Sequence, residues 1–171
     1  MNNSWHRAFG VYGLYIYNDK LLVIRKSRGP YRNRYDLPGG SLEEGEGLTE
    51  ALQREFAEET GLKVIRKNQI GTADFKLPWS WKQHTHVHHI AVFYEVERVE
   101  GALAAPIQFD GQDALGTSWI SEEEVAQDQA SPLVIEAFNW IKNKQCSAEP
   151  VVYKEWRVVE QSEEAPWNQN G

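Results

Sequence analysis

The chain has 171 residues, and 41% of them are apolar and 25% charged, a balance typical of one globular domain and not of a disordered chain. The net charge of −7 argues against general nucleic-acid binding and against an anionic membrane surface, because both favour a basic excess. A lone Cys146 excludes an intrachain disulfide, and no signal peptide or membrane-spanning run is found, so a cytoplasmic location is expected.

The first third of the chain is expected to form a β-hairpin followed by a helix. Apolar and aromatic residues at 9–17 and 21–24 flank a short polar turn, which predicts the hairpin. Residues 38–40, Pro-Gly-Gly, break the strand pattern that follows. Residues 48–60 contain no Pro or Gly, and Gly61 closes this run as a helix C-terminal glycine would.

The rest of the chain is predicted to mix strands and helices. Strands are expected at residues 63–70, 86–96 and 117–120. Ser121 and Glu124 have the spacing of a capping box for a short helix, and Ser131 followed by Pro132 predicts the start of a longer one. Residues 151–159 are predicted as another strand, whose edge is also available to a homodimer partner. We expect one α/β or α+β domain over residues 1–160 and a polar, flexible tail at 161–171.

The predicted helix at residues 48–60 carries three closely spaced carboxylates. Glu55, Glu58 and Glu59 have the i, i+3 and i+4 spacing of neighbours on a helix, and they lie on or beside its apolar stripe. Like charges at that spacing repel, so there is little structural reason for such a cluster unless a cation binds among the carboxylates. Hard oxygen ligands on one rigid helix favour Mg²⁺ or Mn²⁺. The alternative is a solvated acidic face paired with Arg54 and Lys63.

The spacing around this helix follows a longer pattern. Gly40 is followed after five residues by Glu46, and seven more residues lead to Arg54, the three glutamates, Gly61 and Leu62. This arrangement, G-x5-E-x7-R-E-U-x-E-E-x-G-U with U apolar, resembles the Nudix box at every specified position. The preceding Leu37-Pro38-Gly39 is similar to the usual lead-in of that family.

The resemblance implies a Nudix-type α/β/α sandwich around a mixed β-sheet, in which the box forms a loop, a helix and a loop. It implies that Glu55, Glu58 and Glu59 bind the metal, with Gly40 adding a backbone carbonyl or room for the loop to approach the ion. Arg54 is expected to orient these carboxylates. The resemblance also implies that Glu46 braces the loop before the helix and that Gly61 turns the chain out of the helix. Either Glu58 or Glu59 is the expected base within the box.

Candidate residues outside the helix extend the site. Asp113 lies six residues before Trp119, and in many Nudix proteins a Glu at a similar interval reaches the metal; the alternative is a turn aspartate. Arg25 and Arg34, with the backbone of Gly39 and Gly40, are candidates for binding the substrate's phosphates. For both arginines the alternative is a solvated basic loop.

An alternating histidine segment offers a weaker signal. His84, His86 and His88 are expected to share one strand face, with His89 on the other. They suit a cleft-lining strand better than a transition-metal site, since no cysteine ligands accompany them. Trp79 and Trp81 flank this region, where they would stack on a nucleobase or anchor the core or an interface.

The expected function is that of a Mg²⁺- or Mn²⁺-dependent Nudix hydrolase that cleaves a phosphoanhydride bond in a small nucleotide-type substrate. The box does not separate a nucleoside triphosphate from an ADP-sugar or a dinucleotide. Extended nucleic acid and membranes are not expected partners, given the charge. The alternative is a Nudix module that senses nucleotides without turnover, although such modules commonly lose box carboxylates that this chain keeps.

Overall fold

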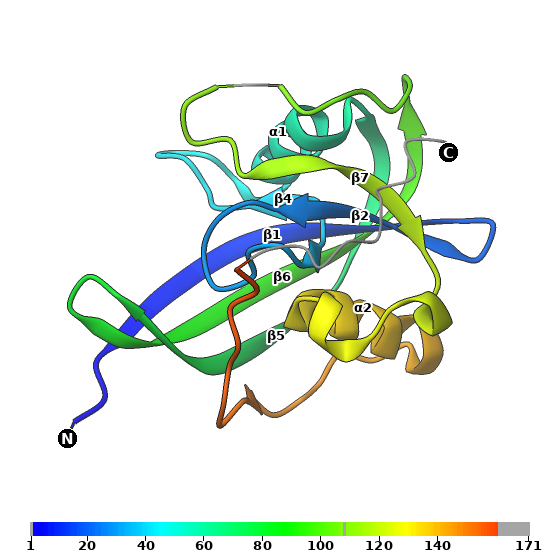
Figure 1. Ribbon diagram of the computed structural model, residues 1–171. Helices are drawn as coiled ribbons and strands as arrows, with labels where there is room; N and C mark the ends of the chain where they lie inside the picture. The colour runs from blue at the N-terminus through cyan, green and yellow to red at the C-terminus, as the bar shows by residue number, and fades with distance from the viewer. Residues whose placement is uncertain (1, 108, 161–171) are drawn as a thin grey trace.

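The computed structural model describes residues 2–107 and 109–160, which form a curled mixed β-sheet with one α-helix on each face (Figure 1). In chain order the elements are β1 (Trp5–Tyr17), β2 (Lys20–Lys26), β3 (Tyr35–Asp36), β4 (Gly39–Gly40), α1 (Leu48–Thr60), β5 (Lys63–Trp81), β6 (His84–Glu100), β7 (Ala114–Ile120), η1 (Glu122–Glu124), η2 (Gln127–Gln129), α2 (Pro132–Asn143) and β8 (Val151–Val152). Neither α-helix of the described part is long and apolar enough to cross a membrane.

Strand β1 lies at the centre of the sheet, whose order is β3-β2-β1-β6-β5-β8. It runs parallel to β6 and antiparallel to β2, while β5 is antiparallel to β6 and parallel to β8. Two further strands pair with this sheet: β4 is antiparallel to β1, and β7 is antiparallel to β2. The predicted mixed sheet is therefore confirmed, and the beginning of the Nudix-like box, at β4, lies against the central strand.

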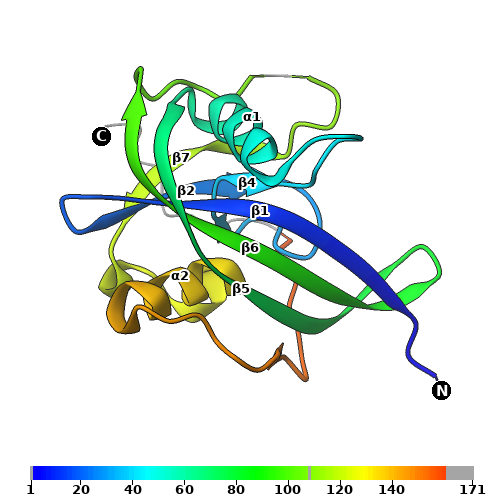
Figure 2. The ribbon, with the colours of Figure 1, turned by 180° about the vertical axis from the view of Figure 1, so that it is seen from behind.

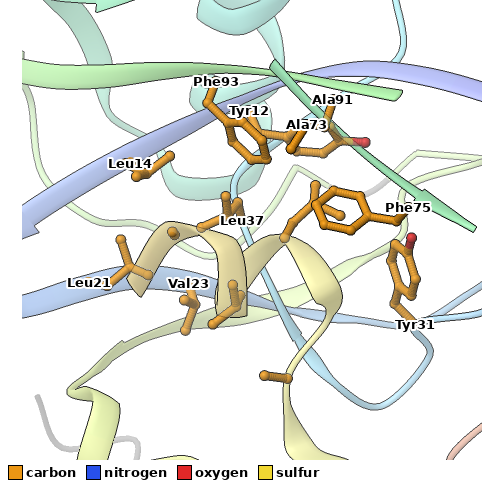
Figure 3. Close-up of a cluster of buried hydrophobic side chains, with 14 of the residues drawn as sticks. Tyr12, Leu14, Leu21, Val23, Tyr31, Leu37, Ala73, Phe75, Ala91 and Phe93 are labelled. Atoms are coloured by element: carbon orange, nitrogen blue, oxygen red, sulfur yellow. The ribbon is translucent and has the colours of Figure 1, made fainter. Parts of the chain in front are cut away.

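The two faces of the sheet bury separate cores, because successive strand residues point to opposite sides. On one face, Val11 and Val92 pack in a cluster with Phe56 of α1. On the other, Leu14 and Phe93 pack in a cluster with the side chains of α2 (Figure 3). The back view shows the two helices on opposite sides of the strands (Figure 2). This layering confirms the predicted α+β sandwich.

Helix α1 has the predicted bounds, and α2 begins at the predicted residue. Helix α1 ends at Gly61, which adopts φ +81° and donates its N–H to the carbonyl of Ala57 at 2.9 Å. Helix α2 begins at Pro132, and the Oγ of Ser131 accepts a hydrogen bond from Val134 N–H at 3.3 Å. These ends depend on residues within one turn, which is why the sequence alone places them.

Five strands are longer than predicted: β1, β2, β5, β6 and β7. Strand β1 begins at Trp5 instead of residue 9, and β5 continues to Trp81 instead of ending at residue 70. Gly71 and Pro78 interrupt the strand pattern of β5, and the structure places register shifts beside them that accommodate both residues. The long pairing with β6, not local propensity, keeps this segment extended.

The predicted strand at residues 151–159 is wrong beyond Val151–Val152. The chain leaves the sheet and crosses to the loop at residues 27–34. There the indole Nε1 of Trp156 donates to the carbonyl of Pro30 at 2.7 Å, and Asn33 Nδ2 donates to the carbonyl of Val159 at 2.7 Å. The single domain over 1–160 and the homodimer stay predictions, and the predicted tail at 161–171 lies outside the described residues.

Candidate functional site

Glu59 lies at the centre of the candidate site and is fully buried. Its Oε1 accepts a hydrogen bond from Gly39 N–H at 2.8 Å, whereas its Oε2 has no hydrogen-bond partner among the described residues. Burial raises the pKa of Glu59 well above its usual value, and the nearby Lys26 ammonium and the Gly39 N–H oppose that rise only in part. A buried carboxylate oxygen without a partner is costly unless a cation or proton joins it.

Arg54 donates hydrogen bonds to Glu55 and Glu58 of α1 and to Glu46 of the preceding loop. Its Nε and Nη2 donate to the two carboxylate oxygens of Glu46 at 2.7 and 2.9 Å, which lowers the pKa of Glu46 to about 2. Its Nη1 donates to Glu55 at 2.9 Å and to Glu58 at 3.4 Å. Burial raises the pKa of Glu55 to about 6 despite Arg54, so this carboxylate also lacks full compensation. Arg54 thus orients the acidic cluster and ties it to the loop.

The two glycines before the loop allow β4 to lie between β1 and α1. A Cβ added at Gly40 would stand 2.8 Å from both Cδ and Oε1 of Glu55. A Cβ added at Gly39, where φ is +149°, would stand 2.1 Å from the carbonyl oxygen of Val11. The backbone therefore approaches the carboxylates as closely as only glycine permits.

The donor set fits a divalent metal ion. Among the residues that the structure describes, no three acidic, histidine or cysteine side chains already converge closely enough to hold an ion. The available donors are nevertheless hard oxygens, which suit Mg²⁺ or Mn²⁺, and the Oε2 of Glu59 lacks a partner in the part of the chain that the structure describes. The fitting donors are the three α1 carboxylates of Glu55, Glu58 and Glu59, with the carbonyl of Gly40.

The structure pairs Asp113 with Lys26, a residue that the sequence did not single out. The Nζ of Lys26 lies 2.6 Å from Asp113 Oδ2. Burial alone would lower the pKa of Lys26, but Asp113, Asp36 and Glu59 together raise it above its usual value. Lys26 is therefore a cation shared by several carboxylates, and its signal in the sequence was its place at the end of β2, two residues after the apolar run at 21–24.

Asp113→Asn is expected to destabilise the protein, unlike an ordinary surface substitution. Removing the carboxylate leaves the largely buried Lys26 without its 2.6 Å partner, so we expect the free energy of unfolding to fall by about 1–3 kcal/mol. Urea unfolding measures this change. Asp110→Asn, at an exposed neighbouring position, is the control and should change stability by less than about 0.5 kcal/mol. Equal losses in the two variants would contradict the pairing.

A cavity of about 200 Å³ adjoins these residues. Its charged and polar lining residues are Lys26, Arg28, Asp36, Ser41 and Asp113. Its aromatic lining residues are His6, Phe9, Tyr12, Tyr31, Trp79 and His89. The cavity thus combines charged groups with rings suited to a planar group.

Of the two predicted phosphate-binding arginines, Arg34 has another role in the structure. It is 4% exposed, and it donates to the carbonyls of Ala130 at 3.1 Å and Arg157 at 2.7 Å. Its guanidinium also stacks 4.2 Å from the ring centroid of Trp156. These contacts join the loop that carries Arg34 to the C-terminal segment and to Ala130, two residues before α2. Arg25, at the pairing of β2 with β3, stays a prediction as a phosphate contact.

The histidine segment lies on β6 with the predicted alternation. His84, His86 and His88 are half-buried, whereas His89 is buried on the opposite face. His88 Nε2 contacts Asp74 Oδ2 at 2.6 Å, so this imidazole has an internal acidic partner. Trp79 lines the cavity, and its ring stacks on that of Trp81 with centroids 6.3 Å apart.

Comparison with known proteins agrees with this geometry. Curated relatives include an ADP-ribose pyrophosphatase of Methanocaldococcus jannaschii, 32% identical over 58% of this chain and 56% of that protein. An 8-oxo-dGTP diphosphatase of Buchnera aphidicola is 37% identical over 33% of this chain and 44% of its own length. The chain therefore spans about half the length of these relatives.

A similar solved structure is the MutT NUDIX hydrolase from Burkholderia pseudomallei. It has a TM-score of 0.64 and 19% identity, and the match covers 78% of this chain and 97% of that one, which supports the fold. The family model described as the NUDIX domain matches residues 5–143, from the first residue of β1 to the last of α2. The chain therefore belongs to the Nudix family.

Proposed function

We propose that this protein hydrolyses a phosphoanhydride bond in a small nucleotide-type substrate with Mg²⁺ or Mn²⁺ as cofactor. The observation that carries the proposal is the fully buried Glu59, on the same helix as Glu55 and Glu58, whose Oε2 has no hydrogen-bond partner within residues 2–107 and 109–160. Such a cluster destabilises a fold that does not use it. The names of the two curated relatives, a pyrophosphatase and a diphosphatase, support the same reaction class.

Different residues of the site would bind the metal ion, position its ligands and accept the proton of the attacking water. A bound divalent cation would neutralise charge on the pyrophosphate and acidify the attacking water. Glu55, Glu58 and Glu59 would hold the cation, and Arg54 would keep the carboxylates in place. Glu58 or Glu59 in the helix, or Asp113 across from Lys26, would accept the proton of the water. The cavity beside Asp113 would receive the rest of the substrate.

The alternative is a Nudix module that binds nucleotides without turnover. The intact set of three α1 glutamates favours the enzyme, because a binding module has no need of a proton acceptor next to a cation. A screen of nucleoside triphosphates, nucleoside diphosphate sugars and dinucleotides, with products identified by mass, separates the two. Release of orthophosphate indicates one branch of the Nudix hydrolases, and release of pyrophosphate or a nucleoside monophosphate indicates another.

Hydrolysis is expected to depend fully on a divalent metal ion. Exhaustive treatment with a chelator should abolish turnover, and added Mg²⁺ or Mn²⁺ should restore it, since the pyrophosphate needs its charge neutralised. Activity should rise with pH into the mildly alkaline range, where the carboxylates are ionised and the attacking water deprotonates more easily. Full turnover after metal removal would contradict the proposed mechanism.

A further inference from the structure

The loop at residues 27–34, which joins β2 to β3, contributes to the lining of the cavity. Four consecutive loop residues line it, Arg28, Gly29, Pro30 and Tyr31. Lys26 and Asp113 of the candidate site line the same cavity. The position of this loop therefore affects the shape and the charge of the space beside the site.

Trp156, in the C-terminal segment, contacts the loop at three positions. Its indole Nε1 donates to the carbonyl of Pro30 at 2.7 Å, and its ring meets the ring of Tyr31 edge-on, with centroids 5.8 Å apart. The guanidinium of Arg34, at the end of the loop, lies 4.2 Å from the centroid of the Trp156 ring. Two of these three contacts are with residues that line the cavity, so Trp156 supports the lining from behind.

The C-terminal segment is itself anchored to the sheet. Val151 of β8 pairs with Phe75 of β5, and Tyr153 N–H donates to the carbonyl of Lys76 at 2.9 Å. All of this segment lies beyond residue 143, where the match to the family domain ends. The support of the cavity loop therefore comes from a part of this chain outside the matched domain.

Arg28 carries a free positive charge on this supported loop. It is exposed, it lines the cavity, and in the described part of the chain it has no hydrogen-bond or ion-pair partner. Arg32 and Arg34 of the same loop are instead bound to the C-terminal segment, by the Glu160 carboxylate at 3.0 Å and by the carbonyl of Arg157 at 2.7 Å. A free guanidinium suits a phosphate, to which it donates two parallel hydrogen bonds.

The cavity has a second basic side chain, which is already paired. Lys26 lies 2.6 Å from Asp113, so its ammonium has an acidic partner before any ligand binds. Of the lysine and arginine side chains that line the cavity, Arg28 is thus the one available to an anionic group without breaking an internal ion pair.

We propose that Arg28 binds a phosphate of the substrate, and that Trp156 is a positioning residue that holds the loop so that the Arg28 guanidinium meets this phosphate. The inference rests on the proposed function, because a nucleotide-type substrate supplies the phosphate. Pro30, which Trp156 holds, is two residues from Arg28. A loop held in place before binding loses less freedom when the substrate arrives, so the contribution of Trp156 passes through Arg28.

Arg28→Gln is expected to raise KM about 10-fold and to leave kcat within about two-fold of wild type, because a contact made equally in the bound substrate and in the transition state changes binding alone. Arg28→Lys should recover part of the loss, since it restores the charge without the paired donors. Steady-state kinetics on the substrate that the screen identifies measure both effects. The control is Arg98→Gln, an exposed arginine on β6 that does not line the cavity.

Trp156→Phe keeps an aromatic ring but removes the N–H that binds Pro30. It should raise KM about three-fold in the wild-type background and add no further rise in the Arg28→Gln background, because the two residues act on one contact. A residue that only stabilised the fold would give independent effects that multiply in the double variant. Trp119→Phe, on β7 and outside the cavity lining, is the matched control and should leave KM unchanged.

Hydrogen exchange in the ligand-free protein tests the positioning step by itself. Asn33 N–H donates to the carbonyl of Lys26 at 2.8 Å, and Arg34 N–H donates to the carbonyl of Tyr31 at 3.0 Å, so both amides report on the loop. In Trp156→Phe these amides should exchange about five-fold faster than in wild type, whereas the amides of β6 should keep their rates.

Non-additive rises in KM, together with faster exchange confined to the loop, support the inference. A wild-type KM in Arg28→Gln, rises that multiply in the double variant, or unchanged loop exchange in Trp156→Phe overturn it. Arg28→Gln alters an exposed side chain, so its result decides the phosphate contact even if thermal melting shows that Trp156→Phe has lost stability.

A non-hydrolysable probe separates this inference from the proposed function. Methylenediphosphonate has a carbon in place of the bridging oxygen, and calorimetry with Mg²⁺ measures its Kd, which should rise about 10-fold in Arg28→Gln. A wild type that binds the probe in this Arg28-dependent way but hydrolyses nothing in the screen contradicts the proposed function alone. Hydrolysis with KM and Kd indifferent to Arg28, or no binding of the probe by wild type, contradicts the inference about Arg28.

Discussion

Glu59→Gln is expected to lower kcat by at least about 10²-fold on the substrate that the screen identifies, because it removes an anionic ligand or the proton acceptor of the water. The amide keeps the shape of the side chain, and its oxygen is still able to accept from Gly39 N–H. The metal-free variant should therefore melt at the wild-type temperature or slightly above it, since a buried charge is gone. Mg²⁺ or Mn²⁺ should raise its melting temperature less than that of wild type.

The matched control is Glu50→Gln, an exposed glutamate in the first turn of the same helix. It should leave both kcat and the metal-dependent rise in melting temperature unchanged. Steady-state kinetics and thermal melts with and without metal make the comparison. If Glu59→Gln kept the wild-type rate and the wild-type response to metal, the carboxylate cluster would be a structural feature and not the metal site.

Gly39→Ala is expected to cause the largest loss of stability, about 3 kcal/mol or more in the free energy of unfolding. The new Cβ would stand 2.1 Å from the carbonyl oxygen of Val11 and 2.7 Å from the Cα of Tyr12, and backbone atoms of a central strand yield little. The φ of +149° adds strain for any residue with a side chain. Chemical denaturation followed by circular dichroism measures the loss.

Gly45→Ala is the control that separates the clash of the new Cβ in Gly39→Ala from the backbone strain of a positive φ. Gly45 also has a positive φ, +75°, but a Cβ there would meet nothing within 4 Å. Only the strain of the left-handed region remains, so we expect a loss of about 1–2 kcal/mol. A Gly39→Ala variant no less stable than Gly45→Ala would show that β4 does not approach β1 as closely as the structure has it.

Features encoded within a few residues were predictable from the sequence. The Leu48–Thr60 helix, its end at Gly61 and the start of α2 at Pro132 all follow from neighbours within one turn. The clustering of Glu55, Glu58 and Glu59 follows from helix periodicity, and the spacing of the box identified the family before any contact was seen. In these cases the backbone geometry of a single element fixes the relative positions of the side chains.

Other features were decided only by the tertiary structure, because they join segments far apart in the chain. Propensity did not predict the extension of β5 past Gly71 and Pro78, which depends on pairing with β6. The C-terminal segment leaves the sheet because Trp156 finds a hydrogen-bond partner on a distant loop.

The polar part of the site is non-local in the same way. Lys26 ends β2 and Asp113 immediately precedes β7, so the two meet only when β2 and β7 pair, and no spacing rule connects them. Burial, which moves the pKa values of Glu59 and His89 away from their usual ranges, is likewise a property of the packed sheet. The sequence by itself determined the family and the acidic helix, whereas long-range strand pairing decided which groups surround the carboxylates, because those contacts exist only after the chain has closed on itself.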